Sequence, residues 1–280
     1  MDVDLRSYHV GQQAVPVFDH RGRGFVARGF DAEDLHAHVS VTPLLTTIIG
    51  DGSNGVNYLF LTPFEEGCYH RLRLRLLLVR HGQTALNADG RFQGQNDTGL
   101  TELGLEQARK VAKALGNLHV TALYSSPLPR ALSTAAEISH QVALNVAPLD
   151  GLKEIHLGDL EGITGSEMRE RYRWVFDTWN ENPSRVTFPG GESIRQLQRR
   201  AWRAVEQIEQ ANPEGTVVAV SHNFAISAIV SRFLGLPLTR FHRIRVDLGS
   251  ISSLEVNAQR RYLVQFNDLC HMTDYSSSEG

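Results

Sequence analysis

Two histidines in this sequence directly follow short apolar runs, a placement that is typical of catalytic residues in α/β proteins. Arg80-His81 follows a run that begins at Leu76, and His222 follows a run that begins at Thr216. Apolar runs of this length predict buried strands. Because open α/β sheets bind their ligands at the carboxyl ends of their strands, we expect both imidazoles at one edge of one sheet.

Two arginines are expected beside these histidines. Arg80 precedes His81, and Arg130 lies near the start of the helix that Pro127 is expected to begin, close to the positive end of its dipole. Two arginines and two histidines in one pocket are costly unless an anion lies among them. Guanidinium groups bind carboxylates and phosphates through paired hydrogen bonds, and we favour a phosphate.

The composition gives no support to several other classes of protein. The chain has 280 residues, of which 41% are hydrophobic and 21% charged, and its formal net charge is −3. These values are ordinary for a globular protein and give no reason to expect nucleic acid or a membrane as a partner. No apolar run is long enough to span a membrane and the chain opens with polar residues, so we expect a cytoplasmic protein. Cys68 and Cys270 lack zinc-type spacing and are expected to be free thiols rather than a disulfide.

Residues 1–71 differ in pattern from the rest and predict a β-containing N-terminal extension of unknown role. Its predicted strands cover residues 39–41, 44–49 and 56–61. The basic, glycine-containing segment 20–25 predicts a loop. His36 and His38 alternate as they would on one face of a strand, but no third ligand follows at a set spacing, so we expect a structural role and no metal site.

From residue 72 onward, predicted strands and helices alternate, which indicates a mainly parallel sheet with helices packed on it. We expect a catalytic domain over residues 72–270 and a disordered, serine-rich tail over residues 271–280. The predicted strands cover residues 76–79, 120–124, 145–149, 216–220, 244–246, 251–256 and 262–266. The predicted helices begin after Thr101 and near Pro127, cover residues 167–179, and follow Ser193 and His222.

The chain from about residue 74 to residue 266 resembles the histidine phosphatase superfamily, which includes the cofactor-dependent phosphoglycerate mutases. The resemblance rests on six blocks that occur in order. They are Val79 to Thr84 with Asn87; Phe92 to Gly94 with Asp97, Leu100 and Thr101; Ser125 to Leu128 with Arg130, Ala131, Thr134 and Ala135; Leu152 with Glu154, Gly158, Glu161 and Gly162; Pro189 to Ser193; and Val220 to His222. The resemblance implies a three-layer α/β/α fold with a mainly parallel central sheet, as in the phosphoglycerate mutases.

The resemblance also implies a role for each candidate catalytic residue. His81 would be the nucleophile that takes the phosphoryl group from a small phosphorylated metabolite. Arg80, Arg130 and His222 would bind the phosphate oxygens and stabilise the charge of the transition state. Glu154 would protonate the leaving oxygen and then deprotonate the water that hydrolyses the phosphohistidine. No metal or cofactor is expected, because the protein itself supplies the positive charges.

Further contacts with the substrate are expected from four residues: Asn87, Gln93, Gly94 and Asn223. Asn87 would donate to a phosphate oxygen. Asn223 stands where a glycine is frequent in the family, and because Asn tolerates unusual backbone angles we expect activity to persist. Asp159 and Glu161 lie close to Glu154 in the sequence and stay open as alternative proton donors.

Three functions are compatible with these residues: a phosphatase, a mutase that returns the phosphoryl group to its substrate, and a phospho-ligand binding module without catalysis. Gln83-Thr84 and the compact stretch between Arg130 and Glu154 resemble the phosphatase branch, and the complete set of catalytic residues argues against a binding module.

The aromatic residues of the 167–179 helix are expected to pack in a cap or to line the pocket. The extension could add a sheet to the catalytic domain or pair strands across a homodimer.

Overall fold

The computed structural model describes residues 14–18, 24–28, 73–96, 98–257 and 260–273. The chain divides into two units, residues 1–70 and 71–280, each of which is described by itself. In the first unit, β1 (Ala14–Phe18) and β2 (Gly24–Arg28) form an antiparallel pair. The segment 20–25 was expected to be a loop, but its last two residues belong to β2. Neither strand was predicted. The three predicted strands of the extension, together with His36, His38 and Cys68, lie outside the described residues.

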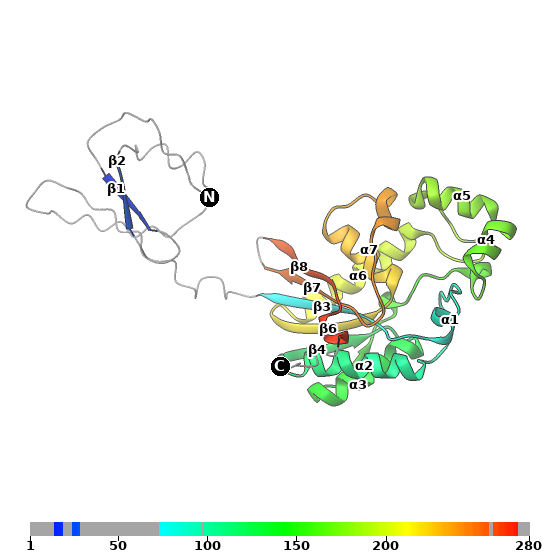
Figure 1. Cartoon of the computed structure of the whole chain (residues 1–280), viewed down its shortest axis with the longest axis horizontal. Helices are drawn as coiled ribbons and strands as arrows, with labels where there is room; N and C mark the ends of the chain where they lie inside the picture. Colours follow the sequence, from blue (N-terminus) through cyan, green and yellow to red (C-terminus); the bar gives the residue numbers. More distant parts are fainter. Residues whose placement is uncertain (1–13, 19–23, 29–72, 97, 258–259, 274–280) are drawn as a thin grey trace, which may run out of the picture. The chain divides into compact units, whose positions relative to one another are not determined.

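The second unit contains a six-stranded sheet whose strand order is β5-β4-β6-β3-β7-β8 (Figure 1). The strands are β3 (Leu74–Arg80), β4 (Val120–Ser125), β5 (Val146–Pro148), β6 (Gly215–Ser221), β7 (Ile251–Val256) and β8 (Arg261–Asp268). β3, β4, β5 and β6 run parallel, whereas β7 is antiparallel to β3 and β8 to β7. The mainly parallel sheet that the sequence predicts is therefore confirmed.

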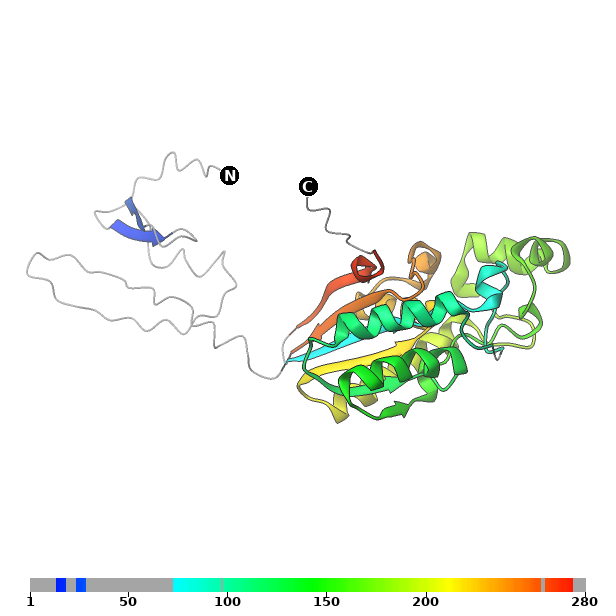
Figure 2. The ribbon, with the colours of Figure 1, turned by 60° about the horizontal axis from the view of Figure 1, so that its bottom comes forward.

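Helices cover both faces of this sheet, which gives the predicted three layers (Figure 2). The helices are α1 (Ala85–Ala88), α2 (Glu102–Leu115), α3 (Pro129–Val142), α4 (Gly165–Arg171), α5 (Arg173–Glu181), α6 (Ile194–Ala211) and α7 (Asn223–Phe233). α2 and α3 lie side by side on one face, and α6 and α7 lie on the other. Short 3-10 helices cover Asp150–Leu152, Gly158–Leu160, Pro183–Arg185, Leu238–Arg243 and Cys270–Met272.

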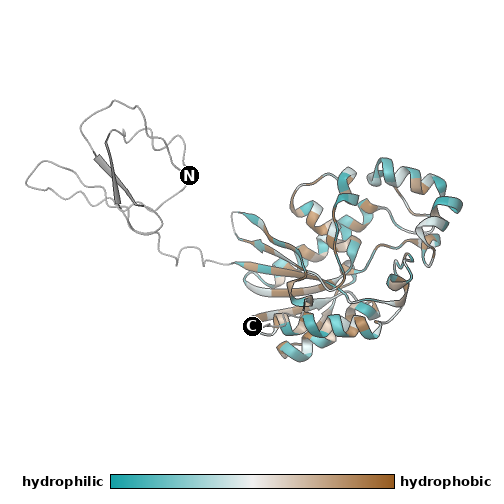
Figure 3. Ribbon diagram, viewed as in Figure 1, coloured by the Kyte–Doolittle hydropathy of each residue, from teal (hydrophilic) through white to brown (hydrophobic). Residues whose placement is uncertain are grey.

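The continuous apolar run of β3 follows from its burial on both faces, which is the usual situation in parallel sheets. Leu76 and Leu78 pack with α6 and α7, whereas Leu77 and Val79 pack with α2 and α3. Figure 3 shows the matching pattern, with apolar residues along the central strands and alternating polar and apolar residues along the helices. Because β3 and its neighbour β6 are fixed in this core, the residues at their carboxyl ends are held firmly.

A third cluster of buried apolar side chains, which we call the cap core, lies among the loop residues 155–163, α4, α5 and the N-terminal turns of α6 and α7. The sequence predicted one helix over residues 167–179, but α4 and α5 are separate helices that meet at Tyr172, whose backbone angles are not helical. The turn at Tyr172 allows Met168 of α4 and Val175 of α5 both to pack into the cap core.

Three further predictions about secondary structure were wrong. Helix α3 begins at Pro129, not near Pro127, because Ser126 still donates its N–H to Val220 of β6. Residues 244–246 are not a strand but a segment without regular secondary structure that follows the 3-10 helix Leu238–Arg243. The predicted tail begins too early, because the 3-10 helix Cys270–Met272 includes residues 271 and 272, while residues 274–280 lie outside the described residues. Cys270 is an exposed, free cysteine.

Candidate active site

The two histidines meet at the carboxyl ends of neighbouring parallel strands. Arg80, the last residue of β3, is in register with Ser221, the last residue of β6, so the next residue of each strand is His81 and His222. The His81 N–H donates to the Ser221 carbonyl at 3.1 Å, and the ring centroids of the two histidines are 5.0 Å apart. The structure therefore brings the two imidazoles together as the strand ends predict.

The hydrogen bonds of His81 define a neutral ring with one nitrogen available as a nucleophile. Nδ1 lies 2.7 Å from the carbonyl oxygen of Gly82, and because a carbonyl only accepts, Nδ1 carries the proton. Nε2 accepts a hydrogen bond from Nε of Arg130 at 3.2 Å. Burial, and then the charges of Arg130 and Arg80, hold the His81 pKa well below its ordinary value. The lone pair of Nε2 is thus kept unprotonated beside a cation.

His222 is also buried and neutral, and it is held by a serine. Its Nε2 lies 2.7 Å from Oγ of Ser126, while Nδ1 is buried without a hydrogen-bond partner among the described residues. Burial lowers the His222 pKa well below its ordinary value, and the nearby Arg130 charge adds to this effect. A buried ring nitrogen without a hydrogen bond costs free energy of folding. A ligand that forms a hydrogen bond with Nδ1 would remove this cost.

Arg130 is almost fully buried, with only 1% of its surface exposed, and it links the nucleophile to a loop. Besides its bond to His81, it donates through Nη2 to the carbonyl oxygen of Gly94 (2.7 Å) and through Nη1 to that of Asn96 (3.0 Å). The guanidinium lies in the first turn of α3, as the sequence predicts. Its planar shape lets one side chain contact three groups in fixed directions.

Arg80 supplies a second cation at the strand edge. Its Nη1 donates to the carbonyl oxygen of Val246, and its Nε is buried without a hydrogen-bond partner in the described part of the chain. Burial lowers the Arg80 pKa from its ordinary value, although Glu154 and Asp247 act in the opposite direction. An arginine held in this state provides both charge and an unused donor for an anion.

Glu154 lies at the N-terminus of helix α7, where its carboxylate binds the first backbone N–H groups of the helix. Oε2 accepts from the N–H of Phe224 (3.1 Å), and Oε1 accepts from those of Ala225 (3.2 Å) and Ile155 (2.8 Å). Only 8% of Glu154 is exposed, and its burial raises the carboxyl pKa even though these hydrogen bonds and the charges of Arg130 and Arg80 lower it. A buried carboxyl with a raised pKa has the property that a general acid requires.

The two alternative proton donors occupy less suitable positions. Glu161 accepts hydrogen bonds through Oε1 from the N–H groups of Gln95 (2.8 Å) and Leu157 (3.3 Å), so it joins two loops. Asp159 is exposed on the surface. Burial and a raised pKa therefore favour Glu154 over both alternatives, and its role as the proton donor stays a prediction.

The other predicted contacts belong to the loop between β3 and α2 and to the first turn of α7. Gln93 is buried, and its amide is bound at both ends, accepting from Oγ1 of Thr84 and donating to Oγ1 of Thr98. Asn87 accepts from the Thr84 N–H through Oδ1, which leaves its Nδ2 group for a ligand. Gly94 contributes its carbonyl oxygen to Arg130, and Asn223 is the first residue of α7. That any of these residues contacts the substrate stays a prediction.

A groove of about 350 Å³ opens beside Arg80 and Asn223. On one side it is lined by an aromatic group in which Phe224 stacks on Trp179 at 5.4 Å and meets Phe241 edge-on at 5.4 Å. The rest is lined by the polar residues Ser227, His242, Arg245 and Asp247 and by the apolar residues Ile244 and Val246. Of the aromatic residues predicted to line the pocket or to pack in the cap, Trp179 does both, whereas Trp174 is mostly exposed.

The family model described as "Histidine phosphatase superfamily (branch 1)" matches residues 76–269 of this chain. The chain belongs to this superfamily. The resemblance inferred from the six sequence blocks is thereby confirmed, and the match covers the six-stranded sheet except the first two residues of β3 and includes both His81 and His222.

Other members of the histidine phosphatase superfamily are similar over most of the second unit. Phosphoserine phosphatase 1 of Hydrogenobacter thermophilus is 34% identical over 202 residues, which cover 72% of this chain and 96% of that protein. A probable phosphoglycerate mutase, GpmB of Yersinia pestis, is 34% identical over 65% of this chain and 85% of its own length. Among solved structures, Bacillus stearothermophilus YhfR has a TM-score of 0.68 and 30% identity, with 71% of this chain and 100% of that one covered.

A mycobacterial glucosyl-3-phosphoglycerate phosphatase, Rv2419c, has a TM-score of 0.65 at 30% identity and covers 70% of this chain and 100% of its own. These relatives confirm the prediction of a phosphatase of the histidine phosphatase superfamily with a phosphoglycerate mutase-like fold. In the part of the chain that the structure describes, no helix is long and apolar enough to cross a membrane. Within the same residues, no group of three or more His, Cys, Asp or Glu side chains is arranged to hold a metal ion.

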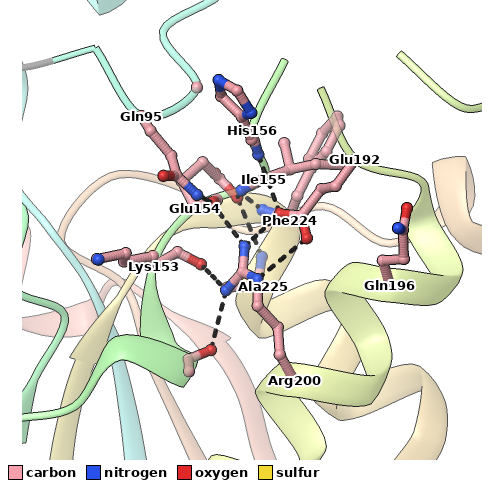
Figure 4. A network of polar contacts seen from close by, with 12 residues as sticks. Gln95, Lys153, Glu154, Ile155, His156, Glu192, Gln196, Arg200, Phe224 and Ala225 are labelled. Carbon is pink, nitrogen blue, oxygen red and sulfur yellow. Dashed lines mark hydrogen bonds and ion pairs between the residues drawn. The ribbon is translucent and has the colours of Figure 1, made fainter. Parts of the chain in front are cut away.

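Sequence reasoning did not identify several residues that hold the site together. Ser126 binds His222, and Arg200 of α6 binds the backbone of Glu154 (Figure 4). Ser126 belongs to one of the family blocks, which was the available signal. Arg200 lies two helical turns after Glu192 of another block, but only the folded loop shows what it contacts.

Proposed function

We propose that this phosphatase hydrolyses a small phosphomonoester by transferring its phosphoryl group to Nε2 of His81. The observation that carries the proposal is the state of His81: its ring is buried and neutral, its proton is held on Nδ1 by a carbonyl, and its Nε2 lies beside a guanidinium. A neutral ring nitrogen with a fixed tautomer is what nucleophilic attack on phosphorus requires.

In the first step, the Nε–H of Arg130 turns from Nε2 to an oxygen of the bound phosphate, and the freed lone pair of Nε2 forms a bond to phosphorus as the bond from phosphorus to the leaving oxygen breaks. Glu154 donates its proton to that oxygen, so the product leaves as an alcohol and the carboxyl becomes a carboxylate. Arg80 and Arg130 bind the oxygens of the transferring group, and Nδ1 of His222 is a further candidate contact. Fixed cations around a transferring phosphoryl group stabilise its transition state without a metal.

In the second step, a water molecule attacks phosphorus and loses a proton to Glu154, and the bond from Nε2 to phosphorus breaks. This releases inorganic phosphate and restores both neutral His81 and protonated Glu154. The raised pKa of Glu154 supports both halves of the cycle, because the carboxyl must hold a proton in one step and accept one in the next.

The groove beside Arg80 is proposed to hold the part of the substrate that leaves. Its lining includes Arg80 and Asn223, which are the sequence neighbours of His81 and His222, and it combines an aromatic wall with polar side chains. One of these, Ser227, has a buried hydroxyl without a hydrogen-bond partner among the described residues. This lining suits a small, polar alcohol that carries further hydrogen-bonding groups.

The names of the relatives indicate which substrates to test first. They include phosphatases for phosphoserine, glucosyl-3-phosphoglycerate and, in one solved structure with 27% identity, α-ribazole-5'-phosphate. These compounds share a phosphate ester and differ in the alcohol. A cytoplasmic location, a homodimer and independence from metals and cofactors stay predictions.

A mutase is the second candidate, because GpmB of Yersinia pestis is as similar in sequence as the named phosphoserine phosphatase. The two functions share phospho-His81 and differ in whether water or a bound acceptor removes the phosphoryl group. Hydrolysis and isomerisation must therefore be measured side by side.

The test is phosphate release from a panel that contains phosphoserine, 3-phosphoglycerate and p-nitrophenyl phosphate, with EDTA present and 2-phosphoglycerate formation monitored in parallel. Wild type, His81→Ala and, as a control at an exposed histidine, His140→Ala would be compared. Release that survives EDTA and is lost only in His81→Ala supports the proposal. Isomerisation without comparable release would make the protein a mutase, and no reaction in either assay would overturn the proposal.

A further inference from the structure

The backbone that carries Glu154 needs support from other parts of the chain. Residues 153–157 form neither helix nor strand and lie between the 3-10 helices Asp150–Leu152 and Gly158–Leu160. A catalytic group must be held close to its productive position, because a displacement of about 1 Å can lower a rate about a hundredfold. Whatever fixes this segment therefore influences the rate.

Arg200 reaches this segment from α6 and holds two of its carbonyl groups and one of the 3-10 helix before it (Figure 4). Nη1 donates to the carbonyl oxygens of Gly151 (3.0 Å) and Lys153 (2.7 Å), and Nη2 donates to that of Glu154 (2.7 Å). Gln95 donates a second hydrogen bond to the Glu154 carbonyl through Nε2, at 3.0 Å. The planar guanidinium presents donors in several fixed directions, which a lysine ammonium cannot copy.

Glu192 fixes Arg200 and the other side of the same segment. Its carboxylate accepts from Nε and Nη2 of Arg200, a two-point contact of the kind that guanidinium and carboxylate groups favour. The same carboxylate accepts from the His156 N–H at 3.0 Å, and the Glu192 N–H donates to the His156 carbonyl at 2.9 Å. The Arg200 side chain is only 24% exposed and that of Glu192 15%, so water weakens this ion pair less than a pair on the surface.

We propose that Arg200 is a positioning residue that holds the carboxyl of Glu154 in its reactive place, with Glu192 holding Arg200. The inference rests on the proposed function, in which Glu154 is the proton donor. Arg200 and Glu192 contact the backbone on both sides of Glu154, whereas the Glu154 carboxylate is bound separately by helix α7. Arg200 and α7 therefore hold opposite ends of the Glu154 residue.

The test compares two substrates that differ in their need for a proton donor. The alcohol of phosphoserine must leave with a proton, whereas p-nitrophenolate leaves without one. The measured quantity is kcat/KM, which reports the steps up to the formation of phospho-His81 and excludes its later hydrolysis. For Arg200→Lys we expect kcat/KM to fall about 10- to 100-fold with phosphoserine and less than about 3-fold with p-nitrophenyl phosphate.

Arg199→Lys is the matched control, because Arg199 is the preceding residue of α6 and is exposed. It should leave both substrates unchanged. Glu192→Gln keeps the size of the side chain but removes its charge, and it should show the pattern of Arg200→Lys in weaker form. It also serves as the test if Arg200→Lys does not fold.

Two kinds of result would overturn the inference. An equal loss with both substrates in the two variants would mean that the pair only stabilises the fold, and wild-type values with both would mean that Glu154 needs no such support. Glu154→Gln, measured alongside, separates this failure from failure of the proposed function. If Glu154→Gln shows no greater loss with phosphoserine than with p-nitrophenyl phosphate, the proton donor itself is wrong. If it does and the Arg200 and Glu192 variants do not, only the positioning role is wrong.

Discussion

Acid should destabilise this protein steeply between about pH 7 and 5.5, because two buried histidines are neutral in the folded state. Burial, followed by the charge of Arg130, lowers the pKa of both His81 and His222 well below 6.5. In the unfolded chain, each returns to an ordinary pKa of about 6.5. The unfolded state then binds more protons than the folded state, so the stabilising contribution is complete above pH 6.5 and is lost as the pH falls below it.

The size of this effect follows from linkage. A histidine that stays neutral when folded loses roughly 1 kcal/mol of unfolding free energy between pH 7 and 5.5, so the pair loses roughly 2 to 3 kcal/mol. Glu154 acts with the opposite sign. Its pKa is raised by burial, so its contribution is present at low pH and is lost as the pH rises through the raised pKa. It therefore adds nothing to the loss in acid.

Urea unfolding at closely spaced pH values, followed by circular dichroism, measures this dependence. In His222→Asn, the loss between pH 7 and 5.5 should be about half that of wild type, whatever the variant's stability at pH 7. His140→Asn, which changes an exposed histidine away from the site, should keep the wild-type dependence. The reasoning is refuted if His222→Asn loses as much stability as wild type over this range.

Three other substitutions test particular contacts. Arg130→Lys keeps the charge, but a lysine cannot contact His81 and two loop carbonyls at once. In a phosphate-release assay, kcat/KM should therefore fall about 10²- to 10³-fold. A loss below about 3-fold would contradict the role of Arg130 in binding the phosphoryl group. Glu161→Gln should lower the midpoint of urea unfolding, because its hydrogen bonds to the two loops become weaker. The ratio of kcat/KM for phosphoserine to kcat/KM for p-nitrophenyl phosphate should not change. A changed ratio would make Glu161 the proton donor. Gly158→Ala should destabilise by more than about 1 kcal/mol in urea unfolding, because φ is +56° and the new Cβ would lie 2.1 Å from the Pro189 carbonyl oxygen. The control Gly165→Ala, at a first-turn position of α4 with open space around it, should be neutral or slightly stabilising, and equal effects of the two alanines would argue against strain at residue 158.

The sequence was sufficient to predict the central sheet and the meeting of the two histidines. Residues such as Leu77 and Leu78 are apolar in succession because each faces a different helical layer, and that pattern can be read without a structure. The end of each run then places His81 and His222 at one edge, since parallel neighbours end on the same side. Local chemistry also predicted the cap of α2, where Thr101 accepts from the Gly104 N–H.

The predictions that were wrong depended on contacts between residues far apart in the sequence. Pro127 and Pro129 are equally suitable for the first turn of a helix, but Leu128 has an extended backbone and Ser126 is bonded to Val220 and His222, so α3 starts at Pro129. Residues 244–246 have the composition of a strand, but the carbonyl of Val246 is bound by Arg80. The support of Glu154 by Arg200 could not be predicted, because its acceptors are backbone carbonyls that have no signature in the sequence.

The central claim is that His81 carries the phosphoryl group, and the most direct test is to isolate that intermediate. p-Nitrophenyl phosphate labelled with ³²P, whose phenolate leaves without a proton from Glu154, would be mixed with wild type, His81→Ala and Glu154→Gln, the reaction quenched with base within milliseconds, and the labelled peptide identified by mass spectrometry. We expect an acid-labile label on His81 that is absent in His81→Ala and accumulates in Glu154→Gln, where hydrolysis of phosphohistidine is slow. Label on any other residue, or phosphate release by His81→Ala at the wild-type rate, would contradict the account.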